Sequence, residues 1–143
     1  MKKQVWLVDD DAEIRSAMKM MFQVLGYDLR TFENGRNLSS ALLAGEIPDL
    51  LFLDINMPEL SGFDILQFIR SRSSWKKLPI LILSTESQDV RVEQSARMGA
   101  DGYVFKPVNL EELENAIHTA VEKRRAITEG RGTGPLGQDK FPY

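Results

Sequence analysis

The sequence contains no cysteine, and this absence excludes several classes of protein. Disulfide bonds, thiol catalysis and cysteine-based metal sites are impossible, and a cysteine-free chain fits a reducing compartment. No apolar run approaches the about 20 residues that a membrane-spanning helix needs. The first residues lead directly into an alternating segment rather than into a signal peptide. We therefore expect a cytoplasmic protein with no membrane partner.

A strong positive charge is also lacking. The formal net charge is −3 at pH 7. Proteins that bind nucleic acid need clustered lysine and arginine side chains to neutralise the phosphate backbone. The one basic cluster, residues 123–125, lies at the end of a predicted helix, where cations complement the helix dipole. We expect no direct contact with nucleic acid.

The chain has the size and composition of one globular domain, with 143 residues of which 43% are hydrophobic and 27% are charged. Periodic apolar patterns continue to about residue 125, after which glycine and proline become frequent. They stand at Gly130, Gly132, Gly134, Pro135 and Gly137. We predict a domain over residues 1–125, followed over residues 126–143 by a flexible tail or the stub of a linker.

Short apolar runs alternate with segments of helical periodicity. The predicted strands are residues 4–8, 27–32, 50–54, 80–83 and 102–105, and a predicted helix follows each of them. Strict alternation of this kind indicates an α/β fold, a (βα)5 doubly wound parallel sheet with helices on both faces and right-handed crossovers. The expected strand order is 2-1-3-4-5, the flavodoxin-like arrangement.

Polar residues stand where the predicted strands end. The first strand runs into Asp9 and Asp10, and the third ends at Asp54. The fourth strand stops at Ser84 and the fifth at Lys106. The carboxyl ends of parallel strands form the ligand crevice of such a sheet, so we expect these side chains to converge.

Three carboxylates at close quarters repel one another. Either one of them stays protonated, or a hard divalent cation binds among them. Oxygen ligands without cysteine or histidine favour Mg²⁺ or Mn²⁺. A cation, a lysine and a hydroxyl around one carboxylate are suited to phosphoryl transfer, with Asp54 as the nucleophile that forms an acyl phosphate.

Each of these residues also has a simpler structural explanation. The acids after the first strand can start a helix, where they favour the helix dipole. Ser84 can cap a helix, and Lys106 can be a surface residue before a proline. The complete set is harder to explain in this way, and we favour a shared site.

With these residues in view, the chain resembles a response-regulator receiver domain of bacterial two-component signalling, of the chemotaxis-receiver kind. The matching motifs are Val8-Asp9-Asp10-Asp11, Asp54-Ile55-Asn56-Met57-Pro58 followed by Gly62, Ser84 five residues after Pro79, and Gly102-Tyr103-Val104-Phe105-Lys106-Pro107. The resemblance extends from residue 4 to about residue 125.

The resemblance implies that Asp54 accepts a phosphoryl group from a sensor histidine kinase or from a phosphotransfer protein of a phosphorelay. It also implies a Mg²⁺ site, held chiefly by Asp10. Asp9, Asp54 and the backbone carbonyl of Asn56 would complete this site. The domain would be a phosphoacceptor that assists its own phosphorylation and dephosphorylation, and not an enzyme with a separate substrate.

The resemblance further implies that Ser84 and Lys106 contact the phosphoryl oxygens, and that the Lys106–Pro107 peptide bond is cis. In such proteins phosphorylation draws the hydroxyl toward the phosphate, and an aromatic in the fifth strand, here Tyr103, swings inward. This repacks the face made by the fourth helix, the fifth strand and the fifth helix. The alternative for Tyr103 is an ordinary half-buried strand aromatic.

Three positions are expected to tune the lifetime of the phosphoryl group. Asn56 and Glu86 match the pair found in chemotaxis receivers, which suggests a short lifetime. Thr85 stands where the family usually has alanine or glycine. A β-branched side chain there is expected to narrow access to Asp54 and to slow water and small phosphodonors.

Several functions are open at this point. The first is a stand-alone receiver that contacts a downstream protein, as a monomer or a phosphorylation-dependent homodimer. The second is the amino-terminal receiver of a longer transcriptional or enzymatic regulator, cut in its linker. An aspartate-nucleophile phosphatase is less favoured, because it needs an acid two residues after the nucleophile, where Asn56 stands. A degenerate receiver is disfavoured by the intact acids and Lys106.

Overall fold

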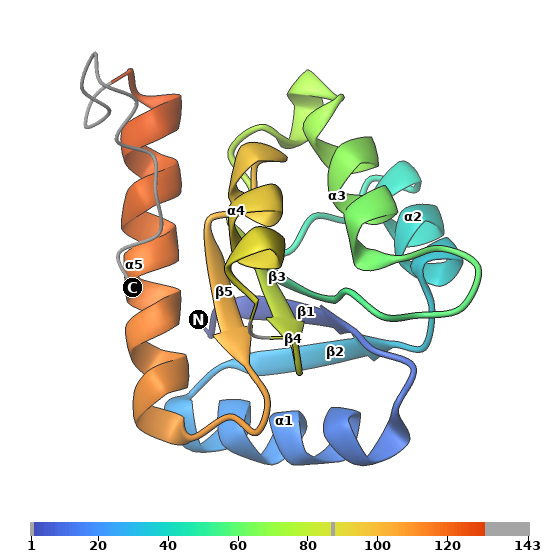
Figure 1. Ribbon diagram of the computed structural model, residues 1–143, viewed down its shortest axis with the longest axis vertical. Helices are drawn as coiled ribbons and strands as arrows, with labels where there is room; N and C mark the ends of the chain where they lie inside the picture. Colours follow the sequence, from blue (N-terminus) through green and yellow to red (C-terminus); the bar gives the residue numbers. More distant parts are fainter. Residues whose placement is uncertain (1, 87, 131–143) are drawn as a thin grey trace.

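The computed structural model describes residues 2–86 and 88–130. At its centre lies a five-stranded parallel sheet (Figure 1). The strands are β1 (Gln4–Val8), β2 (Asp28–Phe32), β3 (Leu50–Asp54), β4 (Ile80–Ser84) and β5 (Gly102–Phe105). They lie in the order β2-β1-β3-β4-β5, and all neighbours are parallel. The predicted α/β fold and strand order are confirmed.

Helices cover both faces of the sheet (Figure 1). They are α1 (Ala12–Leu25), α2 (Gly35–Leu43), α3 (Gly62–Arg70), the short 3-10 helix η1 (Ser73–Trp75), α4 (Asp89–Arg97) and α5 (Leu110–Thr128). Phe22 of α1 and Ile117 of α5 share one buried cluster, whereas Leu38 of α2 and Leu66 of α3 belong to the cluster on the other face. Within the described residues, none of the helices has the length and apolar character needed to cross a membrane.

The central strands β3 and β4 are buried along their whole length. Central strands of a parallel sheet are covered by helices on both faces, which is why their sequences are continuous apolar runs. The edge strand β2 instead alternates between exposed and half-buried residues before it ends at the buried Phe32. Asp54 therefore ends a strand in the middle of the sheet, where an acidic side chain has little contact with water.

Helix α5 is longer than predicted. It continues to Thr128, beyond the expected domain boundary at residue 125, and residue 124 near its end is buried. Gly130, with a φ of 72°, adopts the left-handed conformation that commonly ends a helix. The first residues of the predicted tail are thus helical. The part of that tail from residue 131 onward lies outside the described residues.

A buried ionic network, not predicted from the sequence, explains why the end of α5 is ordered. Asp101 directly precedes β5 and is fully buried. Its Oδ2 lies 2.9 Å from Nη2 of Arg70 in α3, and its Oδ1 lies 2.8 Å from Nη2 of Arg124 in α5. Asp101 also accepts a hydrogen bond from the Ile80 amide at 2.9 Å. Both arginines donate to the Gly99 carbonyl, at 2.9 and 3.0 Å. The network joins α3, α5 and the amino ends of the strands. Asp54 lies at the carboxyl ends of the strands, on the opposite side of the sheet.

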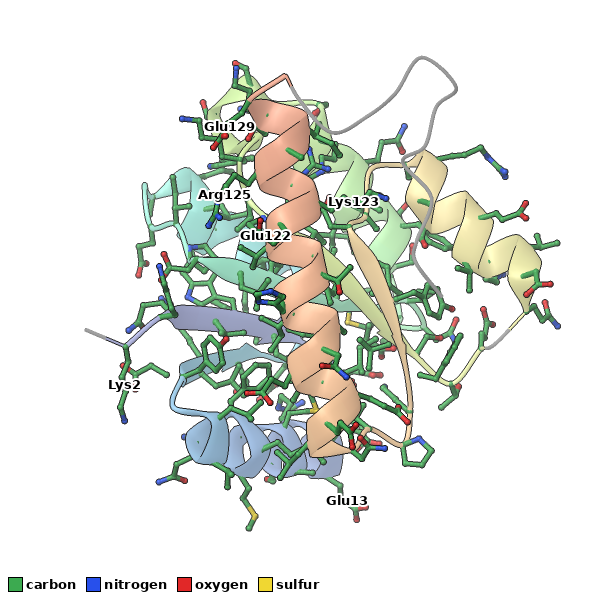
Figure 2. All side chains as sticks on the ribbon, turned by 90° about the vertical axis from the view of Figure 1, so that its left-hand side faces the viewer. Lys2, Glu13, Glu122, Lys123, Arg125 and Glu129 are labelled. Carbon is green, nitrogen blue, oxygen red and sulfur yellow. The ribbon has the colours of Figure 1, made fainter. Side chains whose placement is uncertain are left out.

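Substitution of Asp101 by alanine leaves two buried guanidinium groups without their counter-charge. We expect Asp101→Ala to lower the free energy of unfolding by about 3–5 kcal/mol, the usual cost of breaking a buried ion pair. The measurement is urea unfolding followed by circular dichroism. Glu122→Ala is the control, because Glu122 forms an exposed pair with Arg125 on α5 (Figure 2) and should change stability by less than about 1 kcal/mol. Equal effects of the two substitutions would contradict the structural role of Asp101.

Candidate functional site

The polar residues predicted at the strand ends meet at the carboxyl ends of the parallel strands. Asp54 is the last residue of β3 and Ser84 the last of β4, while Asp9 and Lys106 directly follow β1 and β5. The strands are in register at this edge, with Asp54 opposite Leu83. Asp9, Asp54 and Ser84 are at most 4% exposed. The convergence predicted from the sequence is confirmed.

Lys106 lies between two of the carboxylates. Its Nζ is 2.8 Å from Asp9 Oδ2 and 3.4 Å from Asp54 Oδ1. Its backbone N–H donates to the Ser84 carbonyl at 2.8 Å, which ties the end of β5 to the end of β4. The Lys106–Pro107 peptide bond is cis, as expected. Lys106 thus offers a positive charge held against the acids from the neighbouring strand.

Asp9 is held in place by its neighbours. Its N–H donates to the Phe32 carbonyl at 3.1 Å, and its Oδ1 accepts a hydrogen bond from the Asp11 amide at 3.0 Å. Arg15 of α1 donates to the Asp9 carbonyl at 2.8 Å. Asp11 in turn caps α1, accepting from the amides of its first turn. Arg15 carried no signal in the sequence beyond its helical position, and its role depends on how α1 packs.

The acidic group can hold a metal ion. Asp9, Asp10 and Asp54 each offer a carboxylate oxygen, and these oxygens lie within 4.8 Å of one another. Asp9 and Asp54 are buried, whereas Asp10 is exposed and open to solvent. A set of oxygen donors alone suits a hard divalent cation such as Mg²⁺, which keeps several of its waters when bound.

The same crowding changes the acidity of Asp54. The pKa of Asp54 is raised from 3.8 to about 6, chiefly by burial and then by the negative charge of Asp9. Lys106 and a backbone hydrogen bond from Asn56 act in the opposite direction. Burial alone would lower the pKa of Lys106, but the hydrogen bond to Asp9 and the charge of Asp54 raise it overall. The site therefore favours a charged lysine beside an acid that titrates near neutral pH.

The loop after β3 passes very close to Asp54. The Gly62 amide donates to the Ile55 carbonyl at 3.1 Å, and a Cβ atom at Gly62 would collide with the Asp54 carbonyl. Only glycine allows this approach, because any other side chain would displace the loop or the strand. Asn56, within the loop, is exposed. The position of Asn56 beside the acids is thus set by a close backbone contact.

Ser84 and Tyr103 are linked through the backbone of Glu86. The Glu86 amide donates to Ser84 Oγ at 2.9 Å, and the Tyr103 hydroxyl donates to the Glu86 carbonyl at 2.7 Å. Tyr103 is only 2% exposed, so it is a buried residue and not the half-buried strand aromatic of the alternative interpretation. Burial raises its pKa. Thr85, between Ser84 and Glu86, is exposed at the rim of the site.

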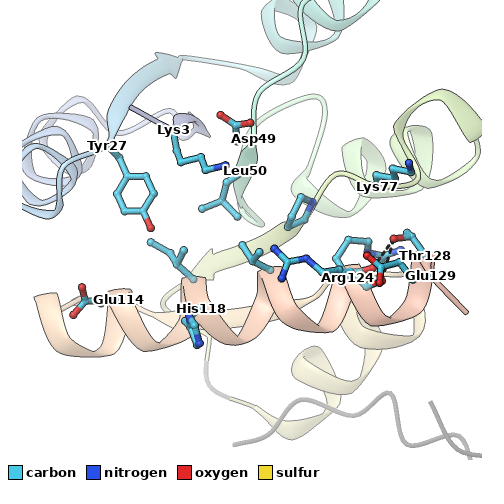
Figure 3. Close-up of a pocket in the computed structure, with 14 residues that line it drawn as sticks. Lys3, Tyr27, Asp49, Leu50, Lys77, Glu114, His118, Arg124, Thr128 and Glu129 are labelled. Atoms are coloured by element: carbon cyan, nitrogen blue, oxygen red, sulfur yellow. Dashed lines mark hydrogen bonds between the residues drawn. The ribbon is translucent and has the colours of Figure 1, made fainter. Parts of the chain in front are cut away.

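Figure 3 shows a groove of about 570 Å³, which none of these residues lines. It runs between α5 and the amino ends of the strands, and its walls include Tyr27, Leu50, His118 and Arg124. None of the residues predicted for the acidic site lines it. The chemistry of the acidic group therefore identifies the candidate site, rather than the size of a hollow.

Comparison with known proteins agrees with this geometry. The family described as "response regulator receiver domain" matches residues 5–118. The chain belongs to this family. The receiver therefore has a histidine kinase as its implied partner, and its acidic group is consistent with a phosphoacceptor.

Individual relatives show the extent of the similarity. The chain is 33% identical to the DNA-binding transcriptional regulator NtrC of Salmonella typhimurium, over 96% of this chain and 31% of that protein. It is 31% identical to the transcriptional regulatory protein KdpE of Mycobacterium tuberculosis, over 87% of this chain and 54% of that protein. The solved structure of chemotaxis protein CheY4 of Vibrio cholerae is 31% identical, with a TM-score of 0.75, covering 84% of this chain and 99% of that one. The receiver thus spans about half or less of these two regulators.

The raised pKa of Asp54 has a consequence for stability. In metal-free protein the folded state binds the Asp54 proton more tightly than the unfolded state does, so stability falls as the pH rises from 3.8 to about 6 and stays lower above that. Asp54→Asn removes this loss. We expect the variant to be more stable than wild type by about 1–3 kcal/mol at pH 7.5, with the difference shrinking below pH 5. The measurement is urea unfolding in EDTA across this pH range.

The control for this experiment is Asp28→Asn, at the exposed start of β2. Its stability difference from wild type should show no comparable rise with pH. A constant difference between Asp54→Asn and wild type from pH 4.5 to 8 would contradict the raised pKa of Asp54.

Proposed function

We propose that this receiver accepts a phosphoryl group on Asp54 from the phosphohistidine of a sensor histidine kinase or phosphotransfer protein, in a Mg²⁺-dependent reaction. The observation that supports it most is the grouping of a buried acid, a lysine Nζ at 3.4 Å and two further carboxylates at the sheet edge. Phosphoryl transfer leaves little covalent work for the protein, which must position the groups and offset negative charge.

The chemical step follows from these positions. An ionised oxygen of Asp54 forms the bond to phosphorus while the bond from phosphorus to the donor's imidazole nitrogen breaks, and the imidazole takes up a proton. The ammonium group of Lys106 offsets the charge of the transferred phosphoryl oxygens, and the Ser84 hydroxyl donates to one of them. Asp9, Asp10, Asp54 and the carbonyl of Asn56 would hold Mg²⁺, which supplies positive charge next to the phosphoryl oxygens.

Phosphorylation by a small phosphodonor tests this proposal. We expect intact-mass measurement to show one added phosphoryl group on wild type in Mg²⁺, and none on Asp54→Ala, because the variant lacks the nucleophile. Omission of Mg²⁺ should abolish labelling of the wild type. Asp49→Ala, at the other edge of the sheet, is the matched control and should be labelled normally. Equal labelling of wild type and Asp54→Ala would exclude Asp54 as the acceptor.

The proposed output is a change of protein contacts on the face formed by α4, β5 and α5. A groove of about 570 Å³ lies on this face. It is lined by Asp89, Val92, Tyr103, Val104, Phe105, Glu112, Asn115, Ala116 and Thr119. Because Tyr103 both lines the groove and contacts the loop after Ser84, a shift at the phosphorylated acid would change the shape of this face. A downstream protein, or a second copy of the receiver after phosphorylation, is the proposed partner.

A second candidate function has a specific observation in its favour. Regulators such as NtrC and KdpE are about twice to three times as long as the part that this chain matches. The chain would then be the receiver of a longer cytoplasmic regulator, with residues after the α5 helix forming the start of a linker. Reading the gene beyond codon 143 distinguishes the two candidates, since a following DNA-binding or enzymatic domain would assign the output to that domain.

The lifetime of the phosphoryl group is proposed to depend on Asn56, Glu86 and Thr85. Thr85 is exposed, and its β-branched side chain is proposed to narrow the approach to Asp54. We expect Thr85→Ala to raise the rates of labelling by a small phosphodonor and of hydrolysis by about two- to tenfold, which corresponds to about 0.4–1.4 kcal/mol of barrier. Time-resolved intact-mass measurement gives both rates. Thr128→Ala, at the far end of α5, should change neither, and unchanged rates in Thr85→Ala would exclude this role.

A further inference from the structure

Glu86, which lies between β4 and α4, makes two hydrogen bonds through its backbone. Its N–H donates to Ser84 Oγ at 2.9 Å, and its carbonyl accepts from the Tyr103 hydroxyl at 2.7 Å. The two groups lie on neighbouring strands, one at the acidic site and one on the α4–β5–α5 face. Any displacement of the Glu86 backbone therefore changes both hydrogen bonds together.

The side chain of Glu86 is anchored to α4. Its Oε2 atom is buried and accepts no hydrogen bond of good geometry from the described residues, but it lies 3.1 Å from Nε of Arg91. A buried carboxylate oxygen is costly unless an opposite charge compensates it. Among the described residues, Arg91 supplies that charge. The position of Glu86 thus depends on an ion pair with the first turn of the next helix.

Arg91 is itself held in position. Its guanidinium carbon lies 5.7 Å from the centre of the Phe63 ring of α3, and its Nη1 donates to Gln94 at 3.3 Å. A guanidinium group over an aromatic face is favourable and restricts the side chain. The ion pair between Arg97 and Glu93 on the same helix is longer and more exposed than the pair between Arg91 and Glu86. Its charged atoms lie 3.8 Å apart, and both side chains are about 70% exposed. The side chain of Arg91 is 39% exposed, and it has a shorter ion pair and more contacts than Arg97.

We infer that Arg91 is a positioning residue that holds Glu86, and through Glu86 the inward arrangement of Tyr103, in which the buried Tyr103 hydroxyl donates to the Glu86 carbonyl. The ion pair stabilises this inward state relative to an outward one.

This positioning has a consequence for phosphorylation, which rests on the proposed function. If the phosphorylated state prefers inward Tyr103, then whatever stabilises inward Tyr103 also favours phosphorylation, because the coupling between two sites is reciprocal. Loss of the ion pair would make the unphosphorylated receiver harder to convert. Arg91 would act in this through Glu86, without touching the reacting atoms.

The test uses the receiver labelled with 3-fluorotyrosine and observed by ¹⁹F NMR without phosphodonor. The Tyr103 resonance is assigned by its loss in Tyr103→Phe. The response of its chemical shift to a change of solvent measures the fraction of molecules in which Tyr103 points inward. We expect Arg91→Ala to lower the ratio of inward to outward Tyr103 by about two- to fivefold, the range for a partly exposed ion pair. Arg97→Ala removes the same charge from the same helix and should leave the ratio unchanged. Equal ratios in Arg91→Ala and Arg97→Ala would overturn the inference.

A double-substitution cycle separates the ion pair from other effects of losing arginine. Glu86→Gln keeps the backbone carbonyl that Tyr103 contacts but removes the carboxylate, so it should lower the ratio as Arg91→Ala does. The double variant Arg91→Ala with Glu86→Gln should be no worse than either single variant, because the same interaction is lost. Additive effects of the two substitutions would show that Arg91 does not act through Glu86, and would overturn the inference.

The NMR measurement is independent of the proposed function. Failure of wild type to become labelled on Asp54 would exclude the proposed phosphoacceptor role while leaving the Tyr103 ratio to decide the role of Arg91. Where labelling occurs, we compare the rates at which the two variants are labelled. The rate for Arg91→Ala should be lower than that for Arg97→Ala, by a factor no larger than the fold-change in the inward-to-outward ratio of Tyr103. A larger loss of rate would show that Arg91 contacts the phosphodonor instead of positioning the loop, and would overturn the inference.

Discussion

Repulsion among the carboxylates of Asp9, Asp10 and Asp54 is the constraint on which the rest of this receiver depends. Two of these acids are buried, and their oxygens are close enough that all of them cannot ionise without compensation. The fold supplies one positive charge, Lys106, and the oxygen donors leave room for a second in the form of a metal ion. The site is therefore destabilising by itself, because Lys106 offsets only part of the effect of burial and of the charge of Asp9 on Asp54.

Such a site requires rigid surroundings, and contacts at both ends of the strands supply them. On the functional edge, backbone hydrogen bonds hold Asp9 to β2 and Lys106 to β4, and the close approach of Gly62 holds the loop after Asp54. On the opposite edge, Asp101 joins two helices through buried arginines. The first set aligns the reacting groups, whereas the second keeps α3 and α5 at a constant distance from the sheet.

The segment that follows β4 lies between the acidic site and the α4–β5–α5 groove. Ser84 ends the strand that lies beside Asp54, and Tyr103 lies beneath the α4–β5–α5 groove. Glu86 contacts both through its backbone and contacts α4 through its side chain. A short segment therefore connects the strand beside the acid, the aromatic and the helix through direct contacts.

The sequence by itself determined the strand order, the strands that carry site residues and the identity of those residues. This was possible because alternation and apolar runs are local signals, and because parallel strands bring their carboxyl ends to one edge. Only the tertiary structure showed that Lys106 pairs with Asp9, 97 residues away, that Arg15 contacts the Asp9 carbonyl, and that Arg91 pairs with Glu86. It also showed that Arg124, which resembled a surface charge at a helix end, is buried against Asp101. Charged residues are common on every helix, and which of them is buried or paired depends on how distant segments pack, which no local pattern encodes.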